Sequence, residues 1–307
     1  MSNQNKRLIW FKGNIVPIDE AKINVLSPTS QFGANVFEGL RAYWNEKDQQ
    51  LYVYKLQEHT QRLQKSLKMM RFNSTFTDEF LNQSVIDIVK ANNFKEDIVC
   101  RQTVFLDGFG SWASIDPVEM FIAPMAKGRV YPDDKIGIDV CISSWERISD
   151  KSMSPKIKMG ANYMNSRAGQ MEAVRNGYDS TIFLNDNGKV SEGPGSCLFM
   201  VRDGVLITPP VTASILESIT RDTIIQIAKD DLDLEVIERD IDRTELYIAD
   251  EIFMCGTAVE IVPVLSVDKL DVSDAKKGNI TQKLENLYFD IVRGNIEKYK
   301  NNLTAIY

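Results

Sequence analysis

The sequence predicts an α+β fold with two domains, built from mostly antiparallel sheets with flanking helices. Short β-prone runs come in pairs around tight turns, as at Lys12-Gly13-Asn14 and at Asp203-Gly204. Segments with helical spacing separate these pairs, which is typical of an α+β protein. A stretch rich in Gly, Pro and charge, M-A-K-G-R-V-Y-P-D-D-K at 125–135, is the candidate linker.

These observations divide the chain into three parts. We expect a small N-terminal domain at 1–127, a linker at 128–135 and a larger C-terminal domain at 136–307 that carries Lys158. The sequence shows no internal repeat and no low-complexity tract.

In the N-terminal part, two helices follow two β-prone runs. Apolar residues recur on one stripe of the first helix, so its spacing predicts a helix over 55–71, and similar spacing predicts another over 77–92. Runs rich in β-branched and aromatic residues predict the strands. The expected strands are 34–44, 51–54, 97–106 and 118–125.

In the C-terminal part, a helix over 161–176 is expected to end at Gly177, a common stop signal. Hairpins should turn at Asp186-Asn187-Gly188 and at Asp203-Gly204. Further helices are expected at about 220–229 and 280–300.

Composition favours an enzyme of the cytoplasm. The chain has 307 residues, of which 43% are hydrophobic and 26% charged, which is typical of a folded globular protein. The net charge of −7 argues against nucleic acid or a membrane surface as a partner, since both attract basic faces. No apolar run approaches the roughly 18 to 20 residues that span a bilayer, and M-S-N-Q-N-K-R does not begin an export signal.

The cysteine and histidine content excludes several chemistries. Cys100, Cys141, Cys197 and Cys255 are far apart in sequence and are expected to be reduced, buried thiols. His59 is the single histidine, so a zinc site with several His ligands is impossible and no metal site is expected. Nucleotide-binding glycine motifs are absent. Lysine, carboxylate and tyrosine chemistry remains, with an organic cofactor as one possibility.

Three segments together fit a pyridoxal phosphate site, although their spacing alone does not establish one. Lys158 lies where β-prone residues give way to a helix, Glu192 follows a hairpin in V-S-E-G-P-G, and Ile219-Thr220 opens a helix. Such a cofactor needs a Schiff-base lysine, an acid for its pyridine nitrogen and amides at a helix start for its phosphate. Each segment also has a simpler interpretation: a solvated lysine, a surface turn and a capped helix.

Ordered motifs from about Ile9 to Asp268 resemble the branched-chain aminotransferases, a family of class IV pyridoxal-phosphate enzymes. The motifs that carry this resemblance are V-F-E-G-L-R-A-Y (36–43), E-H-T-Q-R-L (58–63), G-A-N-Y (160–163), V-S-E-G-P-G (190–195), I-T-P-P-V-T (207–212), L-E-S-I-T-R (216–221) and A-D-E-I-F-M-C-G-T-A-V-E-I-V-P-V (249–264). The resemblance implies a two-domain fold type IV enzyme that works as a homodimer or larger homo-oligomer.

The resemblance also implies roles for individual residues, and the cofactor residues form the larger group. Lys158 would be the cofactor lysine and proton shuttle, Glu192 would face the pyridine nitrogen, and Tyr163 would reach the ring hydroxyl. Leu216 would pack on the ring. The phosphate would be held by Arg62, the amides of Ile219 and Thr220, and the Gly256-Thr257 turn. His59, one turn before Arg62, is expected to be structural.

The substrate would contact a second group of residues. Phe37 and Gly39 would line the side-chain pocket, Thr257 and Ala258 would offer amides to the substrate carboxylate, and Arg101 would bind the second carboxylate of glutamate. Phe109-Gly110-Ser111-Trp112 matches the loop that the family lends across its dimer interface.

The chain departs from many bacterial members of the family in the substrate pocket. Phe32 and Val99 stand where those members have tyrosine, and Val130 or Tyr131 is the nearest match to a linker tyrosine. The activity implied is exchange of amino groups between leucine, isoleucine or valine and 2-oxoglutarate, with the physiological substrate left open. The alternatives are a D-amino-acid or (R)-amine transaminase, a specialised biosynthetic transaminase, an aminodeoxychorismate-type lyase, or a catalytically silent relative.

Overall fold

The computed structural model describes residues 7–132 and 134–307, which fall into two compact units. Of these residues, 7–128, 157–161 and 290–307 form the first unit, and 129–132, 134–156 and 162–289 form the second. The units therefore differ from the predicted domains, because Lys158 and the C-terminal segment belong with the N-terminal part. Residues 1–6 of the predicted first domain and residue 133 of the predicted linker lie outside the described residues.

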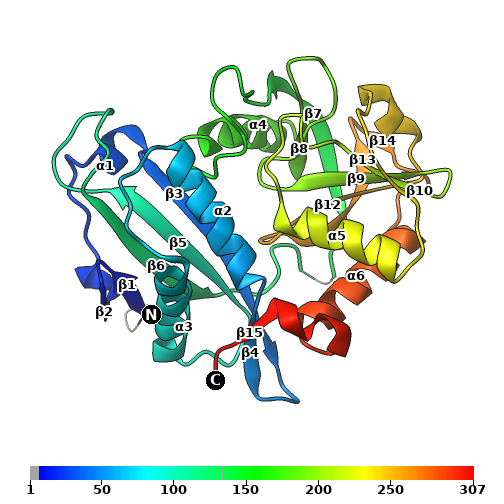
Figure 1. Ribbon diagram of the computed structural model, residues 1–307. Helices are drawn as coiled ribbons and strands as arrows, with labels where there is room; N and C mark the ends of the chain where they lie inside the picture. Colours follow the sequence, from blue (N-terminus) through cyan, green and yellow to red (C-terminus); the bar gives the residue numbers. More distant parts are fainter. Residues whose placement is uncertain (1–6, 133) are drawn as a thin grey trace. The chain divides into compact units, whose positions relative to one another are not determined.

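The first unit is built on a seven-stranded antiparallel sheet with the order β15-β4-β3-β5-β6-β1-β2 (Figure 1). Its strands are β1 (Leu8–Phe11), β2 (Asn14–Pro17), β3 (Asn35–Asn45), β4 (Gln50–Tyr54), β5 (Ile98–Leu106), β6 (Val118–Ala126) and β15 (Leu303–Ala305). The predicted hairpin around Gly13 is confirmed, since Phe11 pairs with Asn14.

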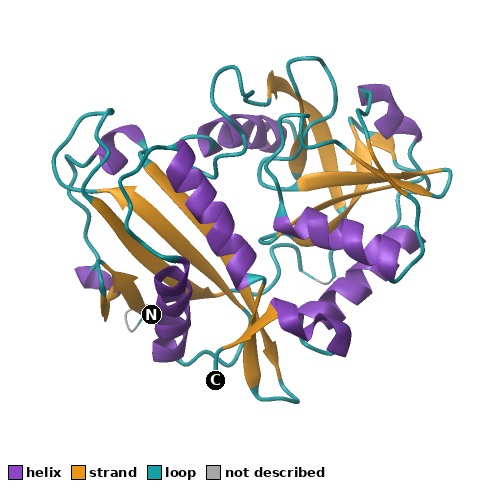
Figure 2. Ribbon diagram, viewed as in Figure 1, coloured by secondary structure: helices purple, strands orange, loops and turns teal. Residues whose placement is uncertain are grey.

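Helices α2 (Leu56–Met69) and α3 (Asp78–Asn92) pack on β3 and on β1 and β6 (Figures 1 and 2). Both predicted helices are confirmed to within two residues. The apolar stripe of α2 buries Leu56, Leu63 and Leu67 in the core of this unit. The side chain of Thr77 caps α3 by accepting from the amide of Phe80, which satisfies one unpaired amide of the first turn. The short helix α1 (Pro28–Phe32) and the 3₁₀ turn η2 (Ile18–Glu20) complete the N-terminal part.

The segment 157–161 joins the first unit because β4 covers only one end of β3. Strand β4 pairs with Ala42–Asn45 of β3 and leaves the earlier half of that edge open. Residues of the later segment fill this gap: the amide of Phe37 donates to the carbonyl of Lys158 at 2.9 Å, and Val36 forms a bridge with Met159. An exposed strand edge thus gains a partner that lies more than a hundred residues away in sequence.

The second unit is built on a mixed sheet of eight strands with the order β11-β10-β9-β12-β13-β7-β8 and with β14 beside β13. The strands are β7 (Ile138–Glu146), β8 (Ser180–Leu184), β9 (Cys197–Arg202), β10 (Val205–Thr208), β11 (Val236–Glu238), β12 (Glu251–Gly256), β13 (Glu260–Val267) and β14 (Leu270–Asp271). The predicted hairpin at Asp203-Gly204 is confirmed by the β9–β10 pairing.

Helices α4 (Tyr163–Arg175) and α5 (Ile219–Asp230) pack against strands of this sheet, α4 on β7 and β8 and α5 on β11 and β12. Both agree with the predicted helices. The predicted helix at 280–300 is wrong in its second half: α6 (Asn279–Val292) ends before Gly294, whose φ of +79° favours glycine. The 3₁₀ helices η3 (Arg243–Ile248) and η4 (Glu297–Asn302) are additional.

Two further findings bear on the excluded chemistries. The four cysteines are free and buried, as predicted, and burial raises the pKa of Cys100 to about 12. Within the described ranges, no helix has the length and hydrophobicity needed to cross a membrane, and no group of His, Cys, Asp or Glu side chains could hold a metal ion.

Candidate active site

The predicted substrate residues of the first unit share one face of its sheet. Phe37 and Gly39 are two residues apart on β3, and Arg101 of β5 lies directly opposite Gly39. The guanidinium of Arg101 stacks over the Phe37 ring at 4.1 Å from its centroid. A Cβ built at Gly39 would meet no heavy atom within 4 Å, so this face is open beside the two side chains.

Lys158 projects toward the same face. Ile157 and Met159 bury their side chains in the core of the unit, so the residue between them points the other way. The amine of Lys158 lies 5.2 Å from the centroid of the Phe37 ring, and its backbone amide donates to the hydroxyl of Ser66. Turns rather than a strand precede Lys158, which corrects the prediction of a strand end. The structure therefore brings Lys158, Phe37, Gly39 and Arg101 together.

Arg62 belongs to a buried cluster on the opposite face of β3. Its Nε and Nη2 donate to the two carboxylate oxygens of Glu38 at 2.7 and 2.8 Å, and Nδ1 of His59 lies 2.7 Å from the same carboxylate. The side chain of Glu38 is fully buried and that of Arg62 is 11% exposed. This bidentate pair fixes the plane of the guanidinium, which a single hydrogen bond would leave free to rotate.

The ionisation of this cluster follows from its contacts. Burial alone would raise the pKa of Glu38, but Arg62 and His59 outweigh it and hold that pKa well below its usual value. Burial lowers the pKa of His59; Glu38 opposes this effect, whereas Arg62 and Lys158 add to it. A carboxylate only accepts hydrogen bonds, so Nδ1 of His59 carries the proton between them. His59 thus has the structural role expected of it, as a partner of Glu38.

In the second unit, Glu192 is a buried carboxylate that faces a buried cation. Its Oε1 accepts from Nε of Arg147 at 2.9 Å and from Nη2 at 2.8 Å, and its Oε2 accepts from the amide of Leu216 at 3.2 Å. Arg147 also donates to Asn165 and Ser166 in the first turn of α4. These contacts favour the charged form of Glu192, which is the form that would hold a proton on a pyridine nitrogen.

The start of α5 provides the expected anion-binding amides. The side chain of Ser218 caps this twelve-residue helix by accepting from the amide of Arg221. The amides of Ile219 and Thr220 belong to the first turn, where the carbonyl four residues earlier lies outside the helix, so the helix itself cannot satisfy them. Leu216 lies two residues before the cap, where Glu192 already binds its amide. The same unit holds Gly256, Thr257 and Ala258 in the turn between β12 and β13.

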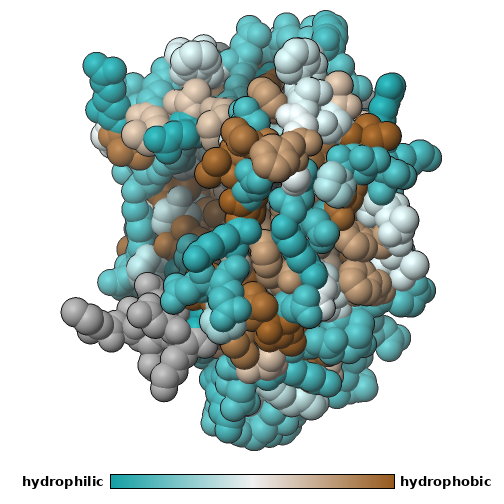
Figure 3. Space-filling view, turned by 90° about the vertical axis from the view of Figure 1, so that its left-hand side faces the viewer, coloured by the Kyte–Doolittle hydropathy of each residue, from teal (hydrophilic) through white to brown (hydrophobic). Residues whose placement is uncertain are grey.

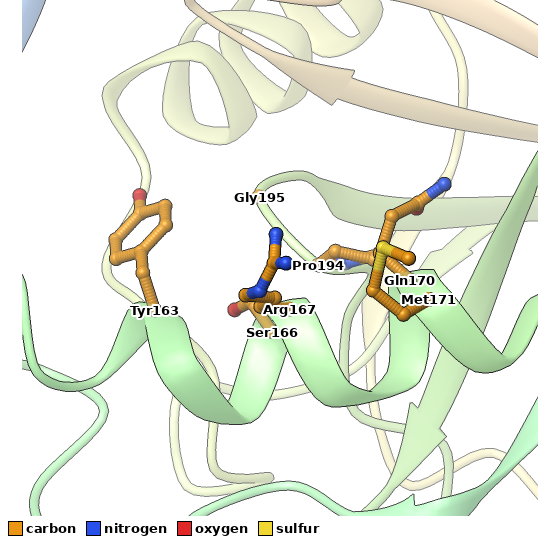
Figure 4. A pocket seen from close by; sticks show the side chains of 7 residues that line it. All are labelled: Tyr163, Ser166, Arg167, Gln170, Met171, Pro194 and Gly195. Atoms are coloured by element: carbon orange, nitrogen blue, oxygen red, sulfur yellow. The ribbon is translucent and has the colours of Figure 1, made fainter.

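Tyr163 borders a hollow of about 360 Å³ between the first turns of α4 and the loop at Pro194-Gly195. Figure 4 shows Tyr163 and Arg167 extending from α4 toward the side where Gly195 lies. Ser166, Gln170 and Met171 complete the lining. Of the expected cofactor residues, only Tyr163 lines this hollow.

The chemistry of these groups is that of a vitamin B6 enzyme. A half-buried lysine amine, a carboxylate kept charged, an oriented guanidinium and free amides at a helix start suit an aldehyde, a pyridine nitrogen and a phosphate. The residues therefore fit pyridoxal phosphate, and each unit holds a separate set of them.

Comparison with known proteins gives the same class. The family model described as "Amino-transferase class IV" matches residues 35–267. The chain therefore belongs to the class IV aminotransferases.

Within that family, several relatives that match this chain over nearly its whole length are named branched-chain aminotransferases. A protein of Aquifex aeolicus named "Probable branched-chain-amino-acid aminotransferase" is 37% identical over 97% of this chain and 96% of its own length. The branched-chain aminotransferase of Thermobaculum terrenum in its PLP-form superposes with a TM-score of 0.93 at 39% identity, over 99% of this chain and 100% of that one. The branched-chain aminotransferase of the archaeon Thermoproteus uzoniensis with norvaline gives 0.92 at 40% identity, over 98% and 99%. The predicted family and fold are thereby confirmed.

Sequence reasoning missed the charged partners of the site. Glu38 stands in the quoted F-E-G motif, yet no role was expected for it. The sequence contained one signal for Glu38. It lies two residues from Val36 and two from Leu40, so it shares the buried face of the strand with these core residues, and a carboxylate there requires a buried cation. Arg147 lies 45 positions before Glu192 and carried no such signal.

Proposed function

We propose that the protein exchanges amino groups between branched-chain L-amino acids (leucine, isoleucine, valine) and 2-oxoglutarate with pyridoxal 5'-phosphate as cofactor. The full-length match to a branched-chain aminotransferase in its PLP-form, at a TM-score of 0.93, carries this proposal. The arrangement of Lys158 and Glu192 within their own units supports it.

The cofactor supplies an electron sink for the negative charge that develops on the substrate's α-carbon. Lys158 would hold the cofactor's aldehyde carbon through its amine and, when the amino group of the substrate displaces that amine, would move the proton at the substrate's α-carbon. Glu192, kept anionic by Arg147, holds a proton on the pyridine nitrogen. Tyr163 would donate to the ring oxygen, and Leu216 would pack on the ring.

The residues that would hold the cofactor's phosphate are Arg62, Ile219 and Thr220 through their amides, and the Gly256-Thr257 turn. Glu38 orients the guanidinium of Arg62 for this task.

The substrate residues divide by the group they recognise. Thr257 and Ala258 offer amides to the α-carboxylate that every substrate carries. Phe37 and the open space at Gly39 accept an aliphatic side chain. Arg101 donates to the second carboxylate of glutamate or 2-oxoglutarate, and the Phe37 ring supports the guanidinium of Arg101 by stacking on it.

We also propose that the protein forms a homodimer or a larger homo-oligomer. A cytoplasmic location stays a prediction. Phe109 and Trp112 are 76% and 79% exposed, and Phe32 lies 6.1 Å from Trp112 between ring centroids. Brown and tan side chains interrupt the polar surface on the face that Figure 3 presents. Aromatic side chains this exposed favour coverage by a second copy of the chain.

The test is a panel of amino donors assayed against 2-oxoglutarate. Leucine, isoleucine and valine of L configuration should react, and their D enantiomers and (R)-amines should not. Borohydride reduction should fix a pyridoxyl group on the peptide that contains Lys158, as mass spectrometry would show. A protein that takes up no cofactor, or that transfers amino groups only from D-amino acids or (R)-amines, would contradict the proposal.

A further inference from the structure

The turn between β12 and β13 ends in a strained residue. Gly256 pairs with Glu260, so Thr257, Ala258 and Val259 form a three-residue turn. Glu260 has φ of +61°, in the left-handed region that glycine and asparagine tolerate best. A glutamate keeps this conformation only where its surroundings enforce it.

Arg129, the first residue of the second unit, holds Glu260 in this conformation. Its Nε lies 3.3 Å from the carboxylate of Glu260, and its Nη2 donates to the carbonyl of Ile261 at 3.2 Å. The guanidinium therefore grips the side chain of residue 260 and the backbone of the next residue. The Glu260 side chain is fully buried, so its carboxylate depends on buried partners rather than on water.

The same guanidinium is fixed from two other directions. It donates to Glu285 at 2.7 Å, and its carbon lies 4.7 Å from the centroid of the Phe289 ring. Lys277 in turn binds Glu285 at 2.6 Å, so two cations face two carboxylates. A cation held by several partners is a rigid anchor for the turn.

We propose that Arg129 and Glu260 are positioning residues that set the affinity of the 257–259 turn for the carboxylate of the substrate. This inference rests on the proposed function, which gives the amides of Thr257 and Ala258 to that carboxylate. Neither Arg129 nor Glu260 binds the substrate itself. Arg129 and Glu260 hold the end of the turn. Because only three residues lie between the paired strands, the position of that end also sets the positions of the Thr257 and Ala258 amides.

A distinctive kinetic pattern follows from this role. Amino-acid and oxo-acid substrates both carry the carboxylate that the turn binds. Displacing the turn should therefore weaken the binding of both substrates by the same factor. Arg101, by contrast, would affect only substrates with a second carboxylate. A residue that merely stabilises the fold would lower the amount of active enzyme and leave KM unchanged.

The first experiment compares Arg129→Met with Lys277→Met at saturating pyridoxal phosphate. Arg129→Met should raise KM for L-leucine and for 2-oxoglutarate about tenfold each, the usual effect of losing one well-placed hydrogen bond to a charged group, and should change kcat less than twofold. Lys277→Met removes the other cation of the cluster, which touches Glu285 and not the turn, and should leave both KM values unchanged.

The second experiment tests the partner residue. Glu260→Gly relieves the backbone strain but removes the carboxylate, so it should raise both KM values as Arg129→Met does, and the double variant should add no more than a further twofold. Glu260→Gln keeps a hydrogen-bond acceptor and should restore KM to within threefold of the wild type. Binding of 4-methylpentanoate, a carboxylate of similar shape that cannot react, should weaken in parallel by calorimetry.

The outcomes separate this inference from the proposed function. A wild-type protein that transfers no amino group would reject the proposed function, and this inference with it. An active wild type whose Arg129→Met variant keeps both KM values, or raises only one of them, would overturn the inference alone. Equal rises of KM in the Lys277→Met variant would also overturn the inference, since they would indicate a general loosening of the cluster.

Discussion

Replacing Glu38 by Gln tests how Arg62, the proposed phosphate ligand, is held. The substitution keeps the shape of the side chain but removes the charge that faces Arg62. Breaking a buried ion pair by removing one partner costs about 3–5 kcal/mol of unfolding free energy. Arg62 is 11% exposed and Gln still accepts one hydrogen bond, so we expect the lower end, about 3 kcal/mol.

The loss should show as a fall of roughly 6–9 °C in the melting temperature, at about 2–3 °C per kcal/mol for a chain of this size. Urea unfolding gives the free energy directly. Glu297→Gln is the matched control in the same unit: its partner is Lys300 and its side chain is 84% exposed, so no measurable change is expected. Equal stability of the two variants would refute the reasoning.

The pH dependence of Glu38→Gln provides a second check. The pKa of Glu38 in the folded protein lies well below the usual 4.5, so its contribution is complete above pH 4.5 and is lost as the pH falls further. The stability difference between wild type and variant should therefore be constant from pH 7 to 5. It should then shrink by up to about 1.4 kcal/mol per pH unit in more acidic solution. A difference that grows on acidification would contradict the assigned charge.

Three further predictions concern the other parts of the proposed site. Arg101→Ala should lower kcat/KM for L-glutamate about 10- to 100-fold, the value of a hydrogen bond between charged groups, and that for L-leucine less than threefold; equal losses in steady-state assays would remove its proposed role. Arg147→Met should lower the melting temperature and weaken cofactor binding in a spectroscopic titration, because it leaves the carboxylate of Glu192 buried without its cation. The surface substitution Lys151→Met, which breaks a pair with Asp186, should do neither. Trp112→Ser should shift sedimentation toward smaller species, and an unchanged assembly would show that this exposed side chain is not covered by a second copy.

The elements of the fold could be predicted from local patterns. The stripe of Leu56, Leu63 and Leu67 predicted α2, and the turn residues Lys12-Gly13-Asn14 predicted the first hairpin. The predicted end of α6 was wrong because the apolar spacing continues past Gly294 into a 3₁₀ helix, whereas the backbone conformation changes at Gly294. Local spacing does not report that change.

The site was predicted through its motifs, but its supporting charges were not. The family resemblance gave Phe37 and Gly39 their expected roles and gave none to Glu38, which lies between them in the motif F-E-G and faces the other side of β3. Its partner Arg62 is 24 residues away, and the pairing exists only once α2 packs on β3. The place of Lys158 in the first unit depends likewise on an open strand edge that no local pattern reveals.

The position of β15 has a consequence for biosynthesis. Strand β4 ends at Tyr54, and its partner in the sheet begins at Leu303, so about 250 further residues must be translated before that edge closes. At about 5–20 residues per second a ribosome needs roughly 12 to 50 seconds for this stretch. During this time the edge of β4 in the nascent first unit remains unpaired. A truncated product that lacks the last few residues should therefore bind chaperones preferentially.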